Sequence, residues 1–352
     1  MEKEYNPAIV KTDDQKHVEA VNIVFLILLI LPQILIILGV DKLLGNTVTA
    51  RLLFSQAIYI LPVLCYLIFV RRSVAPCRFK RIRISNILLC VLMYICLMPV
   101  LTLLNTISYL YSATTFSNLI FQVSSEIPYP VAAIVVALIP AFCEELTYRG
   151  VFYNTYRKVN PLAAIFLSGA LFGLLHGNLN QITYAVALGI IFSLIVEATD
   201  SIFSSMIVHC LVNLFSTTMV YVLPRLFEFL NSLLEEAKAA GDTQTIDMIM
   251  GIVGSEELSI DSVISATPEM FSKQQVLVSI MGSLFPAAIG GFLAFMLFRF
   301  ISKRCGRWEY ICDIFRKPEK SGKIFTIPLI IAFVLMIALI VMNELAARGI
   351  IG

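Results

Sequence analysis

Nine long apolar runs constrain the fold of this chain more than any other feature of its sequence. Apolar residues make up 59% of the 352 residues and charged residues 14%, whereas soluble domains are about 45–50% apolar and about 25% charged. A helix needs about 20 apolar residues to cross a bilayer. The sequence therefore predicts an all-α, polytopic transmembrane helix bundle of about eight or nine spans. The runs are residues 20–40, 52–70, 86–104, 129–148, 161–176, 179–197, 202–223, 276–298 and 324–342.

The Lys and Arg residues gather on one side of the expected membrane. With the N-terminus in the cytoplasm, 20 of the 26 fall in cytoplasmic segments, mainly residues 71–83 and 299–323, and 6 fall on the other side. Cytoplasmic loops of membrane proteins are enriched in these two residue types. We therefore expect a cytoplasmic N-terminus. We interpret the basic loops as topology signals rather than as nucleic-acid binding sites.

The spans and the polar segments between them divide the chain into four regions. We expect an N-terminal three-span block (1–104), a four-span core with the charged and histidine residues discussed below (105–223), an extracytoplasmic acidic insert (224–275), and two C-terminal spans with a basic cytoplasmic loop (276–352). The eight cysteines form no CxxC pair, so neither a disulfide framework nor a zinc knuckle is expected.

The insert contains nine acidic and three basic residues. Its residues 226–240 are amphipathic and predict a helix, and residues 241–243 and 265–268 predict turns. A solvated loop with surface helices is the favoured interpretation, ahead of a lid or a surface that gathers substrate.

Two adjacent glutamates and an arginine, Glu144, Glu145 and Arg149, lie at the end of the run 129–148. Each charge at membrane depth costs about 2.5–3.5 kcal/mol on insertion scales, so such residues usually have a function. Positions four apart on a helix share a face, whereas adjacent positions point about 100° apart. Glu145 is therefore expected to pair with Arg149, which leaves Glu144 to face another group. Pro140 is expected to kink the helix just before the pair.

Two of the three histidines lie in the apolar runs that follow. His176 ends the run 161–176, one helical turn after Phe172, and His209 is four residues before Asn213 and shares its helix face. A histidine or asparagine in a span often serves only to bridge helices by hydrogen bonds. The occurrence of Glu, His, and His with Asn on consecutive spans favours a functional site over this structural explanation. His17, in the charged N-terminal segment, receives no role.

Helix spacing also predicts that these residues lie at a common depth. Asn160 and the proline after it predict a hairpin tip, and Glu144 and His176 each lie sixteen residues from Asn160. At about 1.5 Å per residue the two return to a similar height, and the position of His209 in its own span is compatible with that height. We therefore expect Glu144, His176, His209 and Asn213 to form one site. A strip of small residues is expected to let a neighbouring helix approach closely; it consists of Gly169, Gly173 and Gly177.

This set of residues suits hydrolysis by an activated water molecule. A carboxylate with an imidazole in a partly dry cavity suits general-base catalysis, and a second histidine with an asparagine suits an oxyanion hole. No serine or cysteine is placed beside a histidine together with a third orienting group, and no His-Glu-x-x-His motif occurs. Water-mediated acyl hydrolysis is the reaction that the residues indicate, without identifying the substrate. Two alternatives stay open, a proton-coupled transporter and a membrane scaffold without catalytic activity.

The three motifs together resemble a known family. Glu144-Glu145-x-x-x-Arg149-Gly150, then Phe172-x-x-x-His176, then His209-x-x-x-Asn213 are similar to the motifs of the CAAX prenyl endopeptidase and bacteriocin-processing (CPBP, or Abi) family of intramembrane proteases. The resemblance covers about residues 128–215 and implies a CAAX-protease-like core in region 105–223. By this resemblance Glu144 and His176 activate water, His209 and Asn213 stabilise the oxyanion, and Glu145 and Arg149 support the site.

The resemblance also implies partners and a location. An intramembrane endopeptidase of this type takes a peptide or protein substrate that reaches the site within the membrane, with the lipid bilayer around it and no nucleic acid. We expect a multi-pass protein of a bacterial plasma membrane, and a substrate without a prenyl group. No cofactor is favoured. A zinc ion held by Glu144, His176 and His209 is the second possibility that the family implies. A bacteriocin self-immunity protein that keeps the fold without catalysis is the alternative function.

Overall fold

The structure is a computed structural model that describes residues 7–40, 47–113, 123–253, 272–317 and 320–351. Every regular element in these ranges is a helix, and eight helical segments are long and apolar enough to cross a membrane. The prediction of an all-α, multi-pass helical bundle is therefore confirmed. The candidate spans are Asp13–Ile37, Val48–Arg71, Ile84–Ser108, Tyr129–Tyr156, Leu179–Thr199, Ile202–Ala240, Lys273–Arg304 and Ile327–Ala347.

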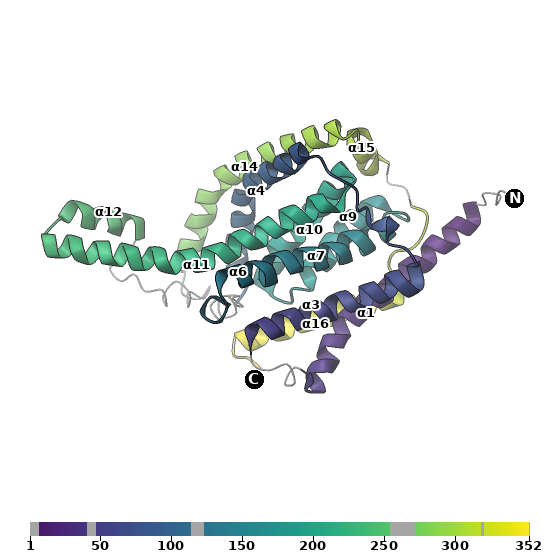
Figure 1. Ribbon diagram of the computed structural model, residues 1–352, viewed down its shortest axis with the longest axis horizontal. Helices are drawn as coiled ribbons and strands as arrows, with labels where there is room; N and C mark the ends of the chain where they lie inside the picture. Colours follow the sequence, from purple (N-terminus) through teal and green to yellow (C-terminus); the bar gives the residue numbers. More distant parts are fainter. Residues whose placement is uncertain (1–6, 41–46, 114–122, 254–271, 318–319, 352) are drawn as a thin grey trace.

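The helices of the first half surround the segment that carries the two glutamates (Figure 1). They are α1 (Pro7–Ile37), α3 (Val48–Cys65) with its π-helical continuation η1 (Tyr66–Arg71), and α4 (Ile84–Ser108), with a short 3-10 turn η2 (Ala75–Cys77) between the last two. The fourth span consists of α6 (Tyr129–Ala132), η3 (Ala133–Leu138), α7 (Ile139–Glu145), η4 (Leu146–Tyr153) and α8 (Asn154–Tyr156).

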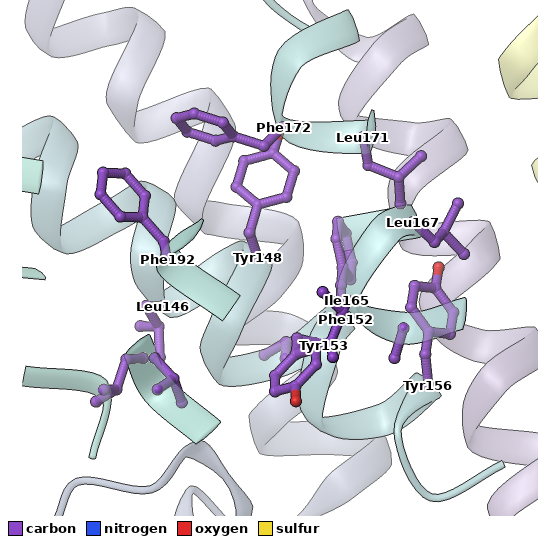
Figure 2. Close-up of a cluster of buried hydrophobic side chains, with 14 of the residues drawn as sticks. Leu146, Tyr148, Phe152, Tyr153, Tyr156, Ile165, Leu167, Leu171, Phe172 and Phe192 are labelled. Carbon is purple, nitrogen blue, oxygen red and sulfur yellow. The ribbon is translucent and has the colours of Figure 1, made fainter. Parts of the chain in front are cut away.

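The second half adds a hairpin, one very long helix and two further spans. Its elements are α9 (Pro161–Leu174), α10 (Leu179–Thr199), α11 (Ile202–Ala240), α12 (Thr243–Val253), α14 (Lys273–Arg304), α15 (Trp308–Arg316) and α16 (Ile327–Ala347). A single large core joins residues from α1, α3, α4, the fourth span, α9 to α11, and α14 to α16. Figure 2 shows part of it, where aromatic side chains of η4 and α8 pack against α9 and Phe192 of α10.

The run 161–176 does not form a full span, which corrects one of the nine runs. α9 has 14 residues, about 21 Å of helix, and this is less than the hydrocarbon thickness of a bilayer. It begins as expected at Asn160, whose side chain accepts a hydrogen bond from the Ala163 N–H at 3.0 Å. It ends before His176, which lies in the turn that leads into α10. α9 is therefore a short internal helix.

The glycines of α9 allow the close approach of α10 that their spacing predicts. A Cβ on Gly173 would lie 2.7 Å from the backbone nitrogen of Val186, and a Cβ on Gly169 would lie 2.8 Å from that of Ile190. Gly177 does not belong to this strip, contrary to the prediction. It lies beyond the end of α9 with φ +65°, a conformation that glycine adopts without steric cost.

The fourth span alternates between α-helical and π-helical turns. η3 precedes Pro140 and η4 follows Glu145, so the glutamates lie between two wide turns rather than at a simple proline kink. The Asn154 side chain donates to the backbone carbonyl of Arg149 at 2.7 Å, which satisfies a carbonyl in the widened part of the helix. Short π-helical segments are frequent at functional sites.

The insert begins as a continuation of a span rather than as a separate surface helix. α11 runs unbroken for 39 residues, about 58 Å, and therefore extends well beyond the membrane. Residues 226–240 are helical, as expected, but they belong to α11. The turn expected at 241–243 is present, with Gly241 at φ +66°, and α12 folds back onto α11 through Leu234 and Ile249 (Figure 1). The turn expected at 265–268 lies outside the described residues.

Contacts between connecting segments define two ends of the bundle. At one end, which we call the basic end, Glu197 binds Arg78, Arg157 and Arg307. The N-terminal part of α1 and the segments before α9 and before α16 meet there too, through the pairs Lys158 with Asp14 and Ser321 with Val159.

The opposite end collects the other connections. The Arg348 side chain donates to the Tyr111 carbonyl at 2.7 Å, and the Asn343 side chain donates to the Gly177 carbonyl at 3.0 Å. Figure 1 shows the start of α1 and α15 toward one side of the molecule, and α6 and α12 toward the other. The basic residues of the expected cytoplasmic loops thus share one end in space.

Candidate functional site

All four residues predicted to form the site line one cavity. The cavity has a volume of about 610 Å³ and is lined by Glu144, His176, His209 and Asn213 together with residues of α3, α4, η3 and α10. A cavity of this size lies within the range of small-molecule and peptide sites. Apolar side chains form most of the remaining wall, and the carboxamides of Gln56, Asn105, Asn180 and Gln181 add polar groups.

Glu145 is the buried acceptor that organises the site. Its Oε1 accepts from Arg149 Nη1 at 2.7 Å and from His209 Nδ1 at 3.0 Å. The side chains of Glu145 and Arg149 have no exposed surface. The ion pair expected from the i to i+4 spacing is therefore present, whereas the bond from Glu145 to His209 was not predicted from the sequence.

Arg149 is enclosed on several sides. A second guanidinium nitrogen donates to the Gly189 carbonyl at 2.9 Å. The guanidinium carbon lies 4.6 Å from the ring centre of Phe172 and 5.1 Å from that of Phe192, distances typical of cation–π contacts. Gly189 makes room for this contact, because a Cβ there would lie 3.2 Å from the guanidinium. The charge of Arg149 is thus directed to Glu145 and kept away from the cavity.

His209 is fixed in orientation by the same two aromatic rings. Its ring is stacked on Phe192, with centroids 5.1 Å apart and an interplanar angle of 25°, and meets Phe172 edge-on at 5.5 Å. Because Nδ1 donates its proton to Glu145, the other ring nitrogen, Nε2, faces the side of Glu144, whose Oε2 lies 3.8 Å away. The hydrogen bond made by one ring nitrogen of a histidine determines whether the other nitrogen carries a proton, and so whether it donates or accepts.

Glu144 and Glu145 differ in their surroundings although they are adjacent. The Glu144 side chain is 18% exposed and lines the cavity, and its ion-pair contact in the described part of the chain is His209 at 3.8 Å. Glu145 is fully buried and bonded to both Arg149 and His209. The helix therefore directs one carboxylate into the cavity and one into the protein, as the 100° offset predicts.

His176 lies at the rim of the cavity, in the turn after α9. Its Nδ1 lies 2.9 Å from the carbonyl oxygen of Phe172. A carbonyl only accepts hydrogen bonds, so Nδ1 carries the proton, and in the neutral ring Nε2 is left with a lone pair. Asn213 lies one turn beyond His209 on α11, is partly buried, and lines the same cavity.

Several features of the site were missed by the sequence analysis. Phe192 contacts both Arg149 and His209, but an aromatic residue in an apolar run carries no signal of its own. The carboxamides Asn180 and Gln181 at the start of the run 179–197 did offer a signal, since two adjacent amides interrupt an apolar stretch. Glu197 also offered one, as an acidic residue at the end of a span.

The expected zinc ligands do not converge as a metal site. Among the residues that the structure describes, no three His, Cys, Asp or Glu side chains are close enough to hold one ion. The Nδ1 atoms of both histidines are engaged, His176 with the Phe172 carbonyl and His209 with Glu145, which leaves Nε2 of each ring as the atom that could bind an ion. In the described side-chain positions, Glu144, His176 and His209 are not gathered closely enough to hold one ion.

Comparison with known proteins places the site in a family. Residues 126–215 match the Rce1-like family, described as Type II CAAX prenyl endopeptidase Rce1-like. The family resemblance is confirmed. The matched segment runs from the start of the fourth span to α11 and contains all four cavity residues named above together with Glu145 and Arg149. Because the Rce1-like family is a protease family, the match supports a membrane peptidase as the general activity. No curated protein and no solved structure matched the chain.

Proposed function

We propose that this protein is an intramembrane endopeptidase that hydrolyses a peptide bond with a water molecule in the cavity. The observation that supports the proposal most directly is that Glu144, His176, His209 and Asn213 line one cavity of about 610 Å³. These residues come from three helical segments and their connecting turns, all inside the part of the chain that matches a protease family.

Glu144 is the general base in this proposal. It is the site carboxylate that faces the cavity, and its neighbour Glu145 already neutralises Arg149. Glu144 takes one proton from the water as the water oxygen bonds to the scissile carbonyl carbon. His176 presents a lone pair on Nε2, because its Nδ1 proton is donated to Phe172, and it holds the water by accepting its second hydrogen. A positioned base of this kind contributes about 10²–10⁴-fold in rate.

His209 and Asn213 stabilise the oxyanion of the tetrahedral intermediate. Asn213 donates from its amide. His209 donates from Nε2, which requires the imidazolium form because Nδ1 already donates to Glu145. Two carboxylate oxygens, at 3.0 and 3.8 Å from the ring nitrogens, balance that charge. Glu145 thus acts as a positioning residue, and Arg149 holds Glu145 in place.

The second half of the reaction returns every group to its starting state. The oxyanion reforms the carbonyl, the C–N bond breaks, and the proton held by Glu144 passes to the leaving nitrogen. The products are a new carboxyl terminus and a new amino terminus, and Glu144 is again a carboxylate. No metal takes part in these steps, in keeping with the donor geometry of the described residues.

We further propose that the protein lies in a plasma membrane with its N-terminus in the cytoplasm. The 20 Lys and Arg residues of the expected cytoplasmic segments outnumber the 6 on the other side. The contacts of Glu197 and Lys158 gather these segments at the basic end, as a common cytoplasmic location requires.

The proposal is tested with purified protein and a library of internally quenched peptides. Glu144→Ala and His176→Ala are expected to abolish cleavage while thermal unfolding in detergent stays close to that of the wild type, because both side chains border a cavity. Full cleavage by either variant would refute the mechanism. If a protective phenotype in cells survived both substitutions and no cleavage were found, the scaffold or immunity function would replace it.

A further inference from the structure

The cavity lies on one side of the membrane. The basic end and the opposite end are defined by loop contacts, and the cavity extends from Phe192 and His209 to residues of the opposite end. Asn180, at the start of α10, precedes Glu197 by seventeen residues, about 25 Å of helix. Tyr109 follows the 25-residue helix α4, which begins near the basic end and spans about 37 Å. Both residues line the cavity.

The exposure of the lining residues increases with distance from the basic end. His209 is 4% exposed and Phe192 has no exposed surface, so the inner part of the cavity is closed. Ser216, two turns further along α11 and farther from the basic end, is exposed, as is His176 in the turn between α9 and α10. The cavity therefore opens away from the basic end.

The chemistry of the wall indicates what enters. Among the lining residues, which all belong to the described part of the chain, there is no Lys or Arg. Carboxamides such as Asn105 and Gln181 occur instead, and these groups both donate and accept, as a peptide bond does. The buried Oε1 of Gln56 has no hydrogen-bond partner among the described groups. An acidic substrate segment would lose its hydration in this cavity, would find no Lys or Arg to pair with, and would be repelled by the Glu144 carboxylate.

We infer that the cavity receives its substrate from the extracytoplasmic side, as an extended peptide segment without acidic side chains that is cleaved at an internal bond. The inference rests on the proposed function and adds to it a side of entry and a substrate class. The orientation comes from the basic end, which faces the cytoplasm. An internal bond follows because a free terminal carboxylate finds no Lys or Arg among the lining residues.

The side of entry is tested with a matched pair of Ser→Cys variants. Ser216→Cys reports on the cavity and Ser321→Cys on the basic end, and both serines are exposed. Each is placed in a full-length background whose eight native cysteines are replaced by alanine. In intact bacterial cells a membrane-impermeant maleimide is expected to label Ser216→Cys and not Ser321→Cys, and inverted vesicles are expected to show the reverse. Labelling of Ser321→Cys alone in intact cells would overturn the inference.

A second measurement uses the native chain and therefore applies even if the cysteine-free protein does not fold. Alkaline phosphatase fused after Gly352 of the otherwise native chain is active only if that end lies outside, whereas green fluorescent protein fused there is bright only if it lies inside. Because Arg348 contacts Tyr111 at the opposite end, an active phosphatase and a dark fluorescent protein are expected. The reverse result would place the cavity mouth in the cytoplasm and overturn the inference.

Cleavage assays separate this inference from the proposed function. An uncharged, internally quenched peptide is expected to be cleaved when added to spheroplasts, and not when added to sealed inverted vesicles. The same peptide with a glutamate on each side of the scissile bond is expected to be cleaved poorly. Cleavage only in inverted vesicles, or equal cleavage of the glutamate peptide, would overturn the inference and leave the peptidase function in place. Absence of cleavage in detergent would refute the function, while the labelling result would still report the side of the cavity.

Discussion

At the basic end, Glu197 accepts hydrogen bonds from three arginines and a tyrosine, whereas in the cavity Glu144 and Glu145 have one arginine and one histidine between them. The tyrosine is Tyr153, at 2.7 Å, and the Arg78 and Arg157 distances are 2.9 and 2.8 Å. Burial lowers and the Glu197 carboxylate raises the pKa of Arg157, and the net shift is upward. The carboxylate oxygens of Glu197 are thus fully occupied by hydrogen-bond donors.

The cavity leaves one carboxylate without such partners. Arg149 and His209 are both directed to Glu145, and the ion-pair contact of Glu144 among the described residues is the more distant ring nitrogen of His209 at 3.8 Å. A carboxylate saturated by guanidinium groups has little capacity to accept another proton, whereas one that faces a cavity keeps that capacity. The comparison teaches that Glu197 and the proposed base Glu144 differ in their partners as well as in their burial.

The largest effect is expected from removing the charge at the basic end. Glu197→Gln removes the counterion of Arg157 and Arg307 and one of the two counterions of Arg78, which also pairs with Asp200. We expect a loss of about 3 kcal/mol in the free energy of unfolding, the lower part of the range for a broken buried pair. The lower value follows because the arginines keep 10–25% side-chain exposure. Denaturant unfolding in detergent measures it. A loss as large from Arg307→Gln, which removes one of three partners, would contradict this account.

An effect of comparable size is expected in the cavity, on rate rather than on stability. Asn213→Ala removes a proposed oxyanion donor, and the turnover rate is expected to fall by about 10²–10³-fold. The Michaelis constant and the unfolding midpoint are expected to change little, since Asn213 is only partly buried at the cavity wall. Cleavage kinetics with one peptide measure both parameters. A raised Michaelis constant with normal turnover would assign Asn213 to substrate binding instead.

A packing change between α9 and α10 tests how the hairpin that carries His176 in its turn is held. Gly173→Ala places a Cβ 2.7 Å from the Val186 nitrogen, and overpacking of this kind costs about 1–3 kcal/mol. Gly282→Ala is the matched control, because no atom lies within 4 Å of its Cβ position in α14. Thermal unfolding is expected to be lowered by the first substitution and not by the second. Equal effects would show that close approach at Gly173 is unimportant.

The smallest effect is expected from chelation. The described residues offer no cluster of three His, Cys, Asp or Glu ligands, so incubation with EDTA or phenanthroline followed by gel filtration is expected to leave peptide cleavage unchanged. Elemental analysis of the purified protein serves as the control. Loss of cleavage on chelation, restored by zinc alone, would overturn the metal-free mechanism.

Local geometry explains which parts of the site could be predicted from the sequence. The pairing of Glu145 with Arg149 follows from helix spacing alone, and the separate direction of Glu144 follows from the same rule. The convergence of Glu144 with His176 was expected from equal distances to the Asn160 turn, and both do line the cavity. These inferences need only the rise and the periodicity of a helix.

Contacts between helices could not be predicted in the same way. The bond from His209 to Glu145 and the ring of Phe192 between α10 and α11 depend on how helices rotate against each other. The early end of α9 and the π-helical turns of the fourth span depend on packing and on bonds such as that of Asn154 to Arg149. The division into four regions stays a prediction.

The most direct measurement compares Glu144→Gln with Glu197→Gln for cleavage per folded molecule and for unfolding free energy. The account predicts opposite patterns. Glu144→Gln loses about 10²–10⁴-fold in turnover and keeps its stability, whereas Glu197→Gln loses stability and keeps turnover. A Glu144→Gln protein that cleaves at the wild-type rate would contradict the claim that the carboxylate facing the cavity is the catalytic base.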